Sequence, residues 1–331
     1  MLDNALTLRL KNLTLRQLRY FLEVAQLHSF TRAAEVLHIA QSALSRQIRM
    51  LEEEFGVALF NRVDRGVTLT EAGARLRDRV AVLLKDLDAM GQDLVGTATE
   101  PRGDLAVGMP PSMREVMTVP LMVDYCRAYP AVTLHVQEGI SIDLSKLVQD
   151  GNLDCAVIVN LMALPHLNAI PLLRERLYLI GPRKGRLHAR RQVSLVRVSE
   201  SPLILTTRPN SLRLIVENAL AAARLPANII ADSNSTAAMV ELAAEGLAST
   251  VLPYSAAWKA IEEKRLSAAP IEGLAIEWIF VHPAARALSA AALAYAHRLR
   301  DLARSQIKQR GWLGAELCAP EGLFQSEMSA S

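Results

Sequence analysis

Five hydrogen-bonding side chains share one face of a helix predicted to begin near residue 41: Gln41, Ser42, Ser45, Arg46 and Arg49. Apolar residues recur along the same segment at steps of four, three and four, at Leu44, Ile48, Leu51 and Phe55. This spacing places them together on the other face, toward a core. Amides, hydroxyls and guanidinium groups can bond base edges and phosphate oxygens. The pattern therefore predicts a helix that contacts nucleic acid.

A cationic hairpin is predicted directly after this helix. Residues 57–60 and 67–69 have the composition of short strands, and the turn-rich segment 61–66 between them carries Arg62 and Arg65. An isolated arginine usually belongs to a solvated surface. Grouped with the polar helix face, these two arginines favour a wing that lies against a nucleic-acid backbone.

Two earlier helices can hold the polar helix in place. A first amphipathic helix is predicted from the apolar spacing of Leu15, Leu18, Phe21, Leu22 and Ala25. A second, at 30–37, presents Ala33 and Ala34, whose small side chains allow close helix packing. Residues 13–70 are thus predicted to form an all-α winged helix-turn-helix domain.

A long linker helix is predicted over residues 71–97. Its apolar residues step by four and three in alternation, which is heptad spacing: Leu76, Val80, Leu83, Leu87, Met90 and Leu94. One such helix per chain favours pairing with a second copy, and hence a homodimer with two recognition helices. Pairing within the same chain is the open alternative.

Short apolar runs alternate with amphipathic helices over residues 103–306, which predicts an α/β effector domain of two lobes with a periplasmic-binding-protein-like fold. Polar or flexible residues follow four of the predicted strands, where α/β sheets bind ligands. We expect an effector site at Pro111, Ser112, Met113, Ser141, Thr206, Arg208, Asn210 and Asn234. These junctions, together with the helix amino termini beside them, suggest a small, anionic effector such as a carboxylate, with Arg208 as its counter-charge. Helix capping explains each serine or asparagine taken alone.

Composition and motifs limit the other classes of function. The 331 residues are 51% hydrophobic and 21% charged, with a net charge of +3, so the motifs and not the charge carry the nucleic-acid prediction. The sequence predicts no export signal, membrane span, cofactor or metal site. It contains no GxSxG, P-loop or GxGxxG motif, which argues against an enzyme. We expect a cytoplasmic protein; a solute-binding or enzymatic α/β protein with an accessory DNA-binding domain is the alternative.

The segment SFTRAAEVLHIAQSALSRQIRMLEEEFGVALFNRVDRGVTLTEAG resembles the N-terminal signature of LysR-type transcriptional regulators. The resemblance implies that Thr31, on the helix before, and the polar residues of the 41–49 face contact promoter DNA, and that Arg62 and Arg65 belong to the wing. It departs from the family at Ala40 and Ser42, where the family commonly has Ser and Pro, so the usual N-cap is absent.

The resemblance extends through the effector domain. PLLRERLYLIG, PLILTTRPNSLR and the EGIS turn are similar to nitrogen-assimilation control proteins and sulfur-assimilation regulators. This likeness implies that Ser112, Ser141 and Thr206 line the effector cleft, that dimers pair into a tetramer, and that RNA polymerase is a possible partner. Residues 307–331 are predicted to be a flexible tail.

Overall fold

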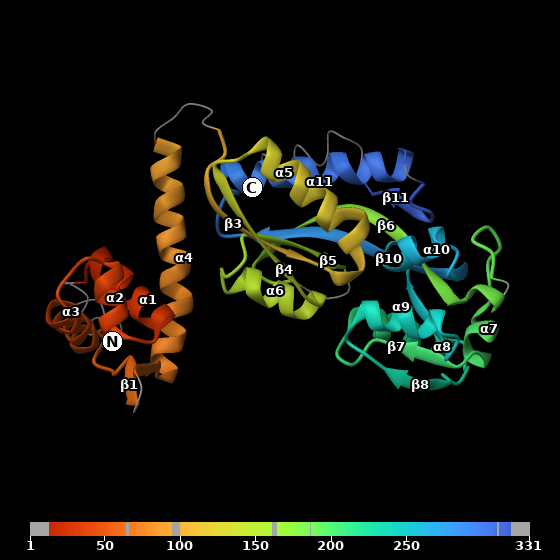
Figure 1. The fold of residues 1–331 in the computed structure, drawn as a ribbon, viewed down its shortest axis with the longest axis horizontal. Helices are drawn as coiled ribbons and strands as arrows, with labels where there is room; N and C mark the ends of the chain where they lie inside the picture. The colour runs from red at the N-terminus through yellow and green to blue at the C-terminus, as the bar shows by residue number, and fades with distance from the viewer. Residues whose placement is uncertain are drawn as a thin grey trace, which may run out of the picture. The chain divides into compact units, whose positions relative to one another are not determined.

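The computed structural model describes residues 13–63, 66–94, 100–160, 164–185, 187–309 and 311–318. The chain divides into an N-terminal unit that ends by Thr97 and a C-terminal unit that begins at Ala98. Figure 1 shows the helices and strands of both units. Each unit has its own hydrophobic core and is described separately below.

The N-terminal unit contains three short helices, a hairpin and one long helix: α1 (Leu15–Leu27), α2 (Phe30–Val36), α3 (Gln41–Phe55), β1 (Phe60–Val63), β2 (Gly66–Leu69) and α4 (Glu71–Leu94). Its core includes Phe21, Ala33, Leu44 and Ile48, so the predicted apolar faces pack together. The winged helix-turn-helix architecture predicted from the sequence is thereby confirmed for the described residues.

Helix boundaries in this unit follow local capping chemistry. Thr14 begins α1 with a capping box, in which Thr14 and Gln17 exchange hydrogen bonds. Ala40 begins α3 without a side-chain cap, as the sequence predicts. Gly56 ends α3 with φ = 69°, a left-handed conformation that glycine adopts without strain.

The first hairpin strand begins later than predicted, whereas the second, β2, begins at Gly66, one residue before the predicted start. The prediction placed a strand at 57–60, whereas β1 begins at Phe60 and pairs antiparallel with β2, with Arg62 opposite Val67. Segment 57–59 is held instead by the Glu52 carboxylate, whose Oε1 accepts a hydrogen bond from the Leu59 amide at 2.8 Å. The predicted start of the strand was wrong because the Glu52 side chain, and not a neighbouring strand, accepts the hydrogen bond of the Leu59 amide.

The C-terminal unit is a mixed α/β structure. Its strands are β3 (Gly103–Met109), β4 (Val132–Glu138), β5 (Cys155–Val159), β6 (Leu167–Pro182), β7 (Leu203–Leu205), β8 (Ile229–Asp232), β9 (Ser249–Pro253), β10 (Leu266–Pro283) and β11 (Ala315–Leu317). Its helices are η1 (Pro111–Met113), η2 (Arg114–Thr118), α5 (Val119–Ala128), α6 (Ser141–Gln149), η3 (Arg183–Gly185), α7 (Leu195–Glu200), α8 (Ser211–Ala222), α9 (Thr236–Ala244), α10 (Tyr254–Glu262) and α11 (Ala290–Gln309).

The C-terminal unit has two lobes, and the two long strands β6 and β10 run through both of them. The strand order is β4-β3-β5-β10-β6-β9-β7-β8, with β11 paired to β6. Residues 169–173, near the start of β6, pair with a part of β10 that pairs with β5 on its other side. Residues 178–180, near the end of β6, pair with β9 on one side and with β10 on the other (Figure 1). β3, β4 and β5 are parallel, as are β7, β8 and β9, whereas β6 and β10 run antiparallel to their neighbours. The predicted two-lobed α/β fold is confirmed, with crossing strands that make the sheet mixed.

The prediction of a flexible tail from residue 307 is wrong for the residues that the structure describes there. Helix α11 continues to Gln309, and β11 pairs antiparallel with β6. Between them, Trp312 is 3% exposed and its indole Nε1 donates to Glu175 Oε1 at 2.7 Å. This buried contact orders the segment through 318; residues 319–331, also predicted to belong to the tail, lie outside the described residues.

Glu175 is a buried carboxylate at the centre of this arrangement. It also accepts hydrogen bonds from Trp278 Nε1 at 2.9 Å, from the Ser255 amide at 2.9 Å and from Ser255 Oγ at 3.1 Å. Burial raises the pKa of Glu175, and these hydrogen bonds oppose that rise. One carboxylate thus connects β6, β10, the start of α10 and the C-terminal segment.

Candidate nucleic-acid interface and ligand pocket

The polar face of α3 is exposed, and its apolar face is buried. Arg46 and Arg49 are exposed, and neither forms an ion pair with a described residue. Gln41 and Ser42 are also exposed, while Ser45 is half-buried and its Oγ accepts a hydrogen bond from Gln41 Nε2 at 3.1 Å. Guanidinium groups left without carboxylate partners can bond phosphates or guanine edges.

Of the other three residues predicted to contact nucleic acid, the structure describes the side chain of Thr31 alone. Thr31 is exposed on the first turn of α2. Arg62 belongs to β1, but its side chain lies outside the described residues, as does the whole of Arg65. Their proposed contacts to DNA therefore stay predictions from the sequence.

Two residues that the sequence reasoning missed attach the hairpin to the helices. Glu52, on α3, accepts hydrogen bonds from the amides of Leu59 and Phe60. The Phe60 ring contacts Phe21 and Phe30 with centroid separations of 5.4 and 5.7 Å. The wing is thus held to α3 by a carboxylate and to α1 and α2 by aromatic packing. The signal in the sequence is a run of three glutamates, at 52–54, in the last turns of α3 before the hairpin.

The predicted dimerisation residues of α4 divide into two groups. Val80 is 3% exposed and belongs to the core of the N-terminal unit, and Leu76 packs against that core. Leu83 is 45% exposed, and Leu87 is half-buried. The side chains of Met90 and Leu94 lie outside the described residues. Leu76 and Val80 are therefore already covered within their own chain.

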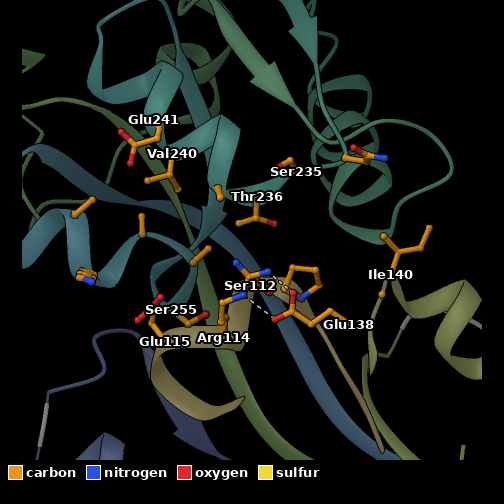
Figure 2. Close-up of a pocket in the computed structure, with 18 of the residues that line it drawn as sticks. Ser112, Arg114, Glu115, Glu138, Ile140, Ser235, Thr236, Val240, Glu241 and Ser255 are labelled. Carbon is orange, nitrogen blue, oxygen red and sulfur yellow. Dashed lines mark hydrogen bonds and ion pairs between the residues drawn. The ribbon is translucent and has the colours of Figure 1, made fainter. Parts of the chain in front are cut away.

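A pocket of about 710 Å³ lies between the two lobes of the C-terminal unit. Figure 2 shows that residues following β3 and β4 face residues of α9 and α10 across it. Its volume lies within the roughly 300–1,000 Å³ typical of small-molecule sites. Its uncharged polar lining residues include Ser112, Asn234, Ser235, Thr236 and Ser255.

Carboxylates outnumber cations in the lining of this pocket. The charged residues are Glu115, Glu138, Asp143, Glu241, Glu263, Arg114, Lys259 and Arg265. Arg114 pairs with Glu138, as Figure 2 shows, and Arg265 pairs with Glu241. The hydrogen bond from Arg265 lowers the pKa of Glu241. Lys259 forms no ion pair with a described residue, so it is the cation left available to a ligand.

Three of the predicted effector residues, Pro111, Ser112 and Asn234, line this pocket. Met113 is not among the lining residues and is fully buried in the core. Ser141 Oγ accepts a hydrogen bond from the Val159 amide at 3.0 Å, which joins α6 to β5. The sequence reasoning missed the lining residues of α10, although Ser255 lies just after the end of β9, at the same kind of strand-to-helix junction as Ser112 and Asn234.

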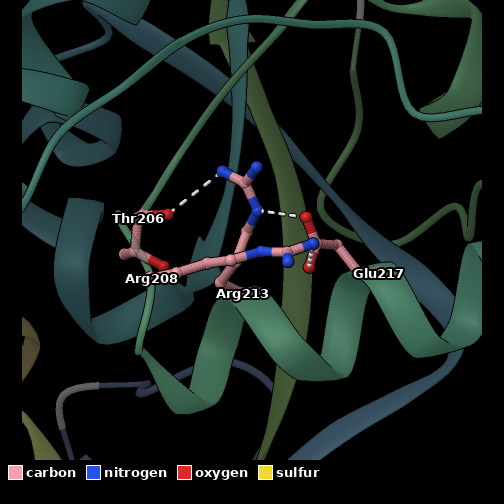
Figure 3. A network of polar contacts seen from close by, with 4 residues as sticks. All are labelled: Thr206, Arg208, Arg213 and Glu217. Carbon is pink, nitrogen blue, oxygen red and sulfur yellow. Dashed lines mark hydrogen bonds and ion pairs between the residues drawn. The ribbon is translucent and has the colours of Figure 1, made fainter.

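The other predicted effector residues surround the start of α8 (Figure 3). Arg208 donates to Glu217 Oε2 at 2.7 Å, and Arg213 bonds both Glu217 and the Thr206 carbonyl. Burial raises the pKa of Glu217, but the hydrogen bonds and charges of Arg213 and Arg208 together outweigh this rise, so the net shift of the pKa is downward. Asn210 caps α8 through the Leu212 amide, and Thr206 Oγ1 is buried without a hydrogen-bond partner among the residues that the structure describes. None of these residues lines the pocket.

Within the part of the chain that the structure describes, no group of His, Cys, Asp or Glu side chains is arranged to hold a metal ion. The three cysteines form no disulfide: Cys155 is buried, whereas Cys126 and Cys318 are exposed. None of the helices among the described residues has the length and apolar character needed to cross a bilayer.

A winged helix-turn-helix with an exposed cationic helix face, joined to an α/β unit with a pocket between two lobes, defines a ligand-binding regulator of the helix-turn-helix class. Two family models match the chain: the bacterial regulatory helix-turn-helix protein of the lysR family over residues 15–74, and the LysR substrate binding domain over residues 98–304. The chain belongs to the LysR family. It is a DNA-binding transcriptional regulator with an effector-binding domain.

Curated relatives agree with this assignment. The nitrogen assimilation regulatory protein nac of Klebsiella aerogenes is 35% identical over 246 residues, which covers 74% of this chain and 80% of the relative. The HTH-type transcriptional regulator BbuR of Bordetella bronchiseptica is 32% identical over 71% of this chain and 72% of the relative. The expected likeness to nitrogen-assimilation control proteins is confirmed. These relatives are named as regulators, so the enzymatic and solute-binding alternatives are not favoured.

Solved structures share the fold at lower sequence identity. A full-length OxyR variant from Pseudomonas aeruginosa aligns with a TM-score of 0.68 at 23% identity, covering 88% of this chain and 94% of that one. Full-length CbnR, solved in a complex with its target DNA, aligns with a TM-score of 0.63 at 21% identity, covering 88% of this chain and 100% of that one. Both confirm the architecture of a full-length LysR regulator.

Proposed function

We propose that the exposed face of α3 reads promoter DNA in the major groove, with Gln41, Ser42, Ser45, Arg46 and Arg49 as contact residues. The observation that carries this proposal is the exposure of Arg46 and Arg49 on a helix whose opposite face is buried. Thr31 of the preceding helix, and Arg62 and Arg65 of the hairpin, are proposed to contact the backbone. The DNA complex solved for CbnR supports this arrangement by shared fold.

Footprinting on the DNA just upstream of the chain's own coding sequence tests this proposal. Arg46→Ala and Arg49→Ala should each weaken specific binding by about 1–3 kcal/mol, or roughly five- to 150-fold. Arg197→Ala is the matched control, because it removes an exposed arginine from the C-terminal unit. Affinity unchanged in both recognition-helix variants would place the DNA-contacting surface elsewhere.

We propose that the pocket between the lobes binds a small polar effector with an anionic group and a cationic or hydrogen-bond-donating group. The available ammonium of Lys259 and the amino end of α9 favour an anion. Glu115, Asp143 and Glu263 form no ion pair with a described residue and favour a donor. This composition adds a donor group to the small anionic effector expected from the sequence, and Arg208, the expected counter-charge, does not line the pocket.

Thermal shift of the full-length protein against amino acids, dicarboxylates and monoamines tests the pocket assignment. A zwitterion should raise Tm, and Lys259→Gln should abolish the rise. Lys184→Gln, an exposed lysine of η3 that does not line the pocket, should leave it unchanged. A ligand-induced rise in Tm that persists in Lys259→Gln would contradict the assigned role of Lys259.

We further propose that the chain acts in the cytoplasm as a homodimer that pairs into a tetramer, as its family likeness implies. Leu83, Leu87, Met90 and Leu94 of α4 are the proposed contacts between subunits, since Leu76 and Val80 are covered by their own core. Leu83→Glu should lower the assembly state in sedimentation velocity. An unchanged sedimentation coefficient would exclude Leu83 from the interface.

Effector binding is proposed to close the lobes and change the DNA bend, and so the recruitment of RNA polymerase. The two crossing strands supply the connection about which the lobes would move. This step requires that the effector bind one arrangement better than the other. A bound effector that changes neither footprint nor bending would refute it.

A further inference from the structure

A second pocket, of about 610 Å³, lies in the C-terminal unit and shares no lining residue with the pocket between the lobes. Its walls come from three segments: β6 with Pro270 of β10, the loop residues 189–192, and the C-terminal residues 313–316. It includes part of the segment that the sequence predicted to be a tail, so no ligand-binding role was expected there.

Hydrogen-bond donors dominate the polar lining of this second pocket. Arg176, Arg190, Gln192 and Tyr178 present two guanidinium groups, an amide and a phenol. Neither arginine forms an ion pair with a described residue, and the Tyr178 hydroxyl makes no hydrogen bond to one. Glu316 is the one carboxylate in the lining, and it likewise forms no ion pair with a described residue. With two arginines and one glutamate, the charged side chains of the lining thus carry a net charge of +1.

Backbone hydrogen bonds hold the three walls in place. The Arg176 amide donates to the Gly314 carbonyl at 2.9 Å, which fixes the C-terminal wall against β6. The Val193 amide donates to the Pro270 carbonyl at 2.9 Å, which fixes the end of the loop against β10. Trp312, just before the C-terminal wall, is anchored on Glu175. The backbone of the three walls is therefore held in place before binding, so the ordering cost of binding falls mainly on the side chains.

We propose that this second pocket binds a small organic anion that carries carboxylate or phosphate groups. Guanidinium groups match the paired oxygens of both groups, and two arginines on a concave surface concentrate an attractive potential. The phenol of Tyr178 and the amide of Gln192 supply further donors to the same oxygens. The lining contrasts with that of the pocket between the lobes, where carboxylates are in excess.

Isothermal titration of the full-length protein with inorganic phosphate, and separately with succinate, tests the second pocket. We expect saturable binding of at least one probe and at least tenfold weaker binding in the Arg176→Gln, Arg190→Gln double variant. Tyr178→Phe, which removes only the hydroxyl, should weaken binding severalfold. Phosphate and succinate distinguish the two anion classes.

Two control variants separate this site from other cations. Arg183→Gln and Lys184→Gln, at two exposed cations of η3 that line neither pocket, should each bind the probe within twofold of the parent protein. Absence of saturable binding of both probes would overturn the proposal. So would binding that is lost in Lys259→Gln but retained in the double variant, because that result would assign the anion to the pocket between the lobes.

Discussion

Replacing Trp312 with phenylalanine should destabilise the C-terminal unit by about 3 kcal/mol. The substitution removes the 2.7 Å hydrogen bond from the indole to the buried Glu175 carboxylate. Removing one partner of a buried hydrogen-bonding group costs about 1–3 kcal/mol, and the loss leaves the Glu175 carboxyl group with fewer donors. The smaller ring also buries less apolar surface, by up to roughly 50 Å², or about 1 kcal/mol.

Denaturation followed by tryptophan fluorescence measures this loss directly. The chain has three tryptophans, Trp258, Trp278 and Trp312, all in the C-terminal unit, so the signal reports that unit alone. Trp258→Phe is the matched control, because the Trp258 indole donates no hydrogen bond to a described residue and the ring is partly exposed. We expect it to cost about 1 kcal/mol or less. If Trp312→Phe costs no more than Trp258→Phe, the role assigned to the Glu175 contact is refuted.

Three further predictions follow from local contacts. Glu52→Ala should release the amides of Leu59 and Phe60, at about 1.5–3 kcal/mol, and hydrogen exchange in peptides spanning 57–69 should accelerate; unchanged protection would contradict the wing attachment. Ala40→Ser should stabilise α3 by about 0.5–2 kcal/mol by supplying the missing cap, seen as slower exchange at its first turn, and no change would argue that the cap is irrelevant there. Because the pKa of Glu217 is lowered in the folded protein, its stabilisation is present above the ordinary glutamate pKa and lost as pH falls through the folded value. Glu217→Gln should therefore cost stability in urea titrations at pH 7 and progressively less toward acid pH, and a constant difference would contradict the ion-pair network.

The N-terminal unit was predictable because its signals are local. The apolar steps at Leu44, Ile48 and Leu51 fix which face of α3 is buried, and the absence of a cap at Ala40 is visible in the residue itself. The start of the wing was misplaced because a side chain on α3, Glu52, bonds the amides that a strand partner would otherwise use. Periodicity carries no information about such a contact.

The ligand pocket was predictable only in part, because its walls come from distant segments. Ser112 and Asn234 were found because they follow the ends of strands, and both line the pocket. Arg208 was expected there for the same reason, but it pairs with Glu217, nine residues later on α8, and does not line the pocket. The C-terminal segment was missed for a similar reason. Trp312 and its partner Glu175 are 137 residues apart, and neither residue type by itself signals a buried pair.

The most direct test of the central claim is an in vitro selection of fragments of the chain's own genome by the purified full-length protein across a salt series. The account predicts discrete enriched fragments that share a roughly two-fold symmetric site, persist as nonspecific binding is lost at higher salt, and disappear with the Arg46→Ala, Arg49→Ala double variant. Recovery of only unlocalised, salt-sensitive binding, or of the same fragments by the double variant, would contradict recognition of DNA by α3.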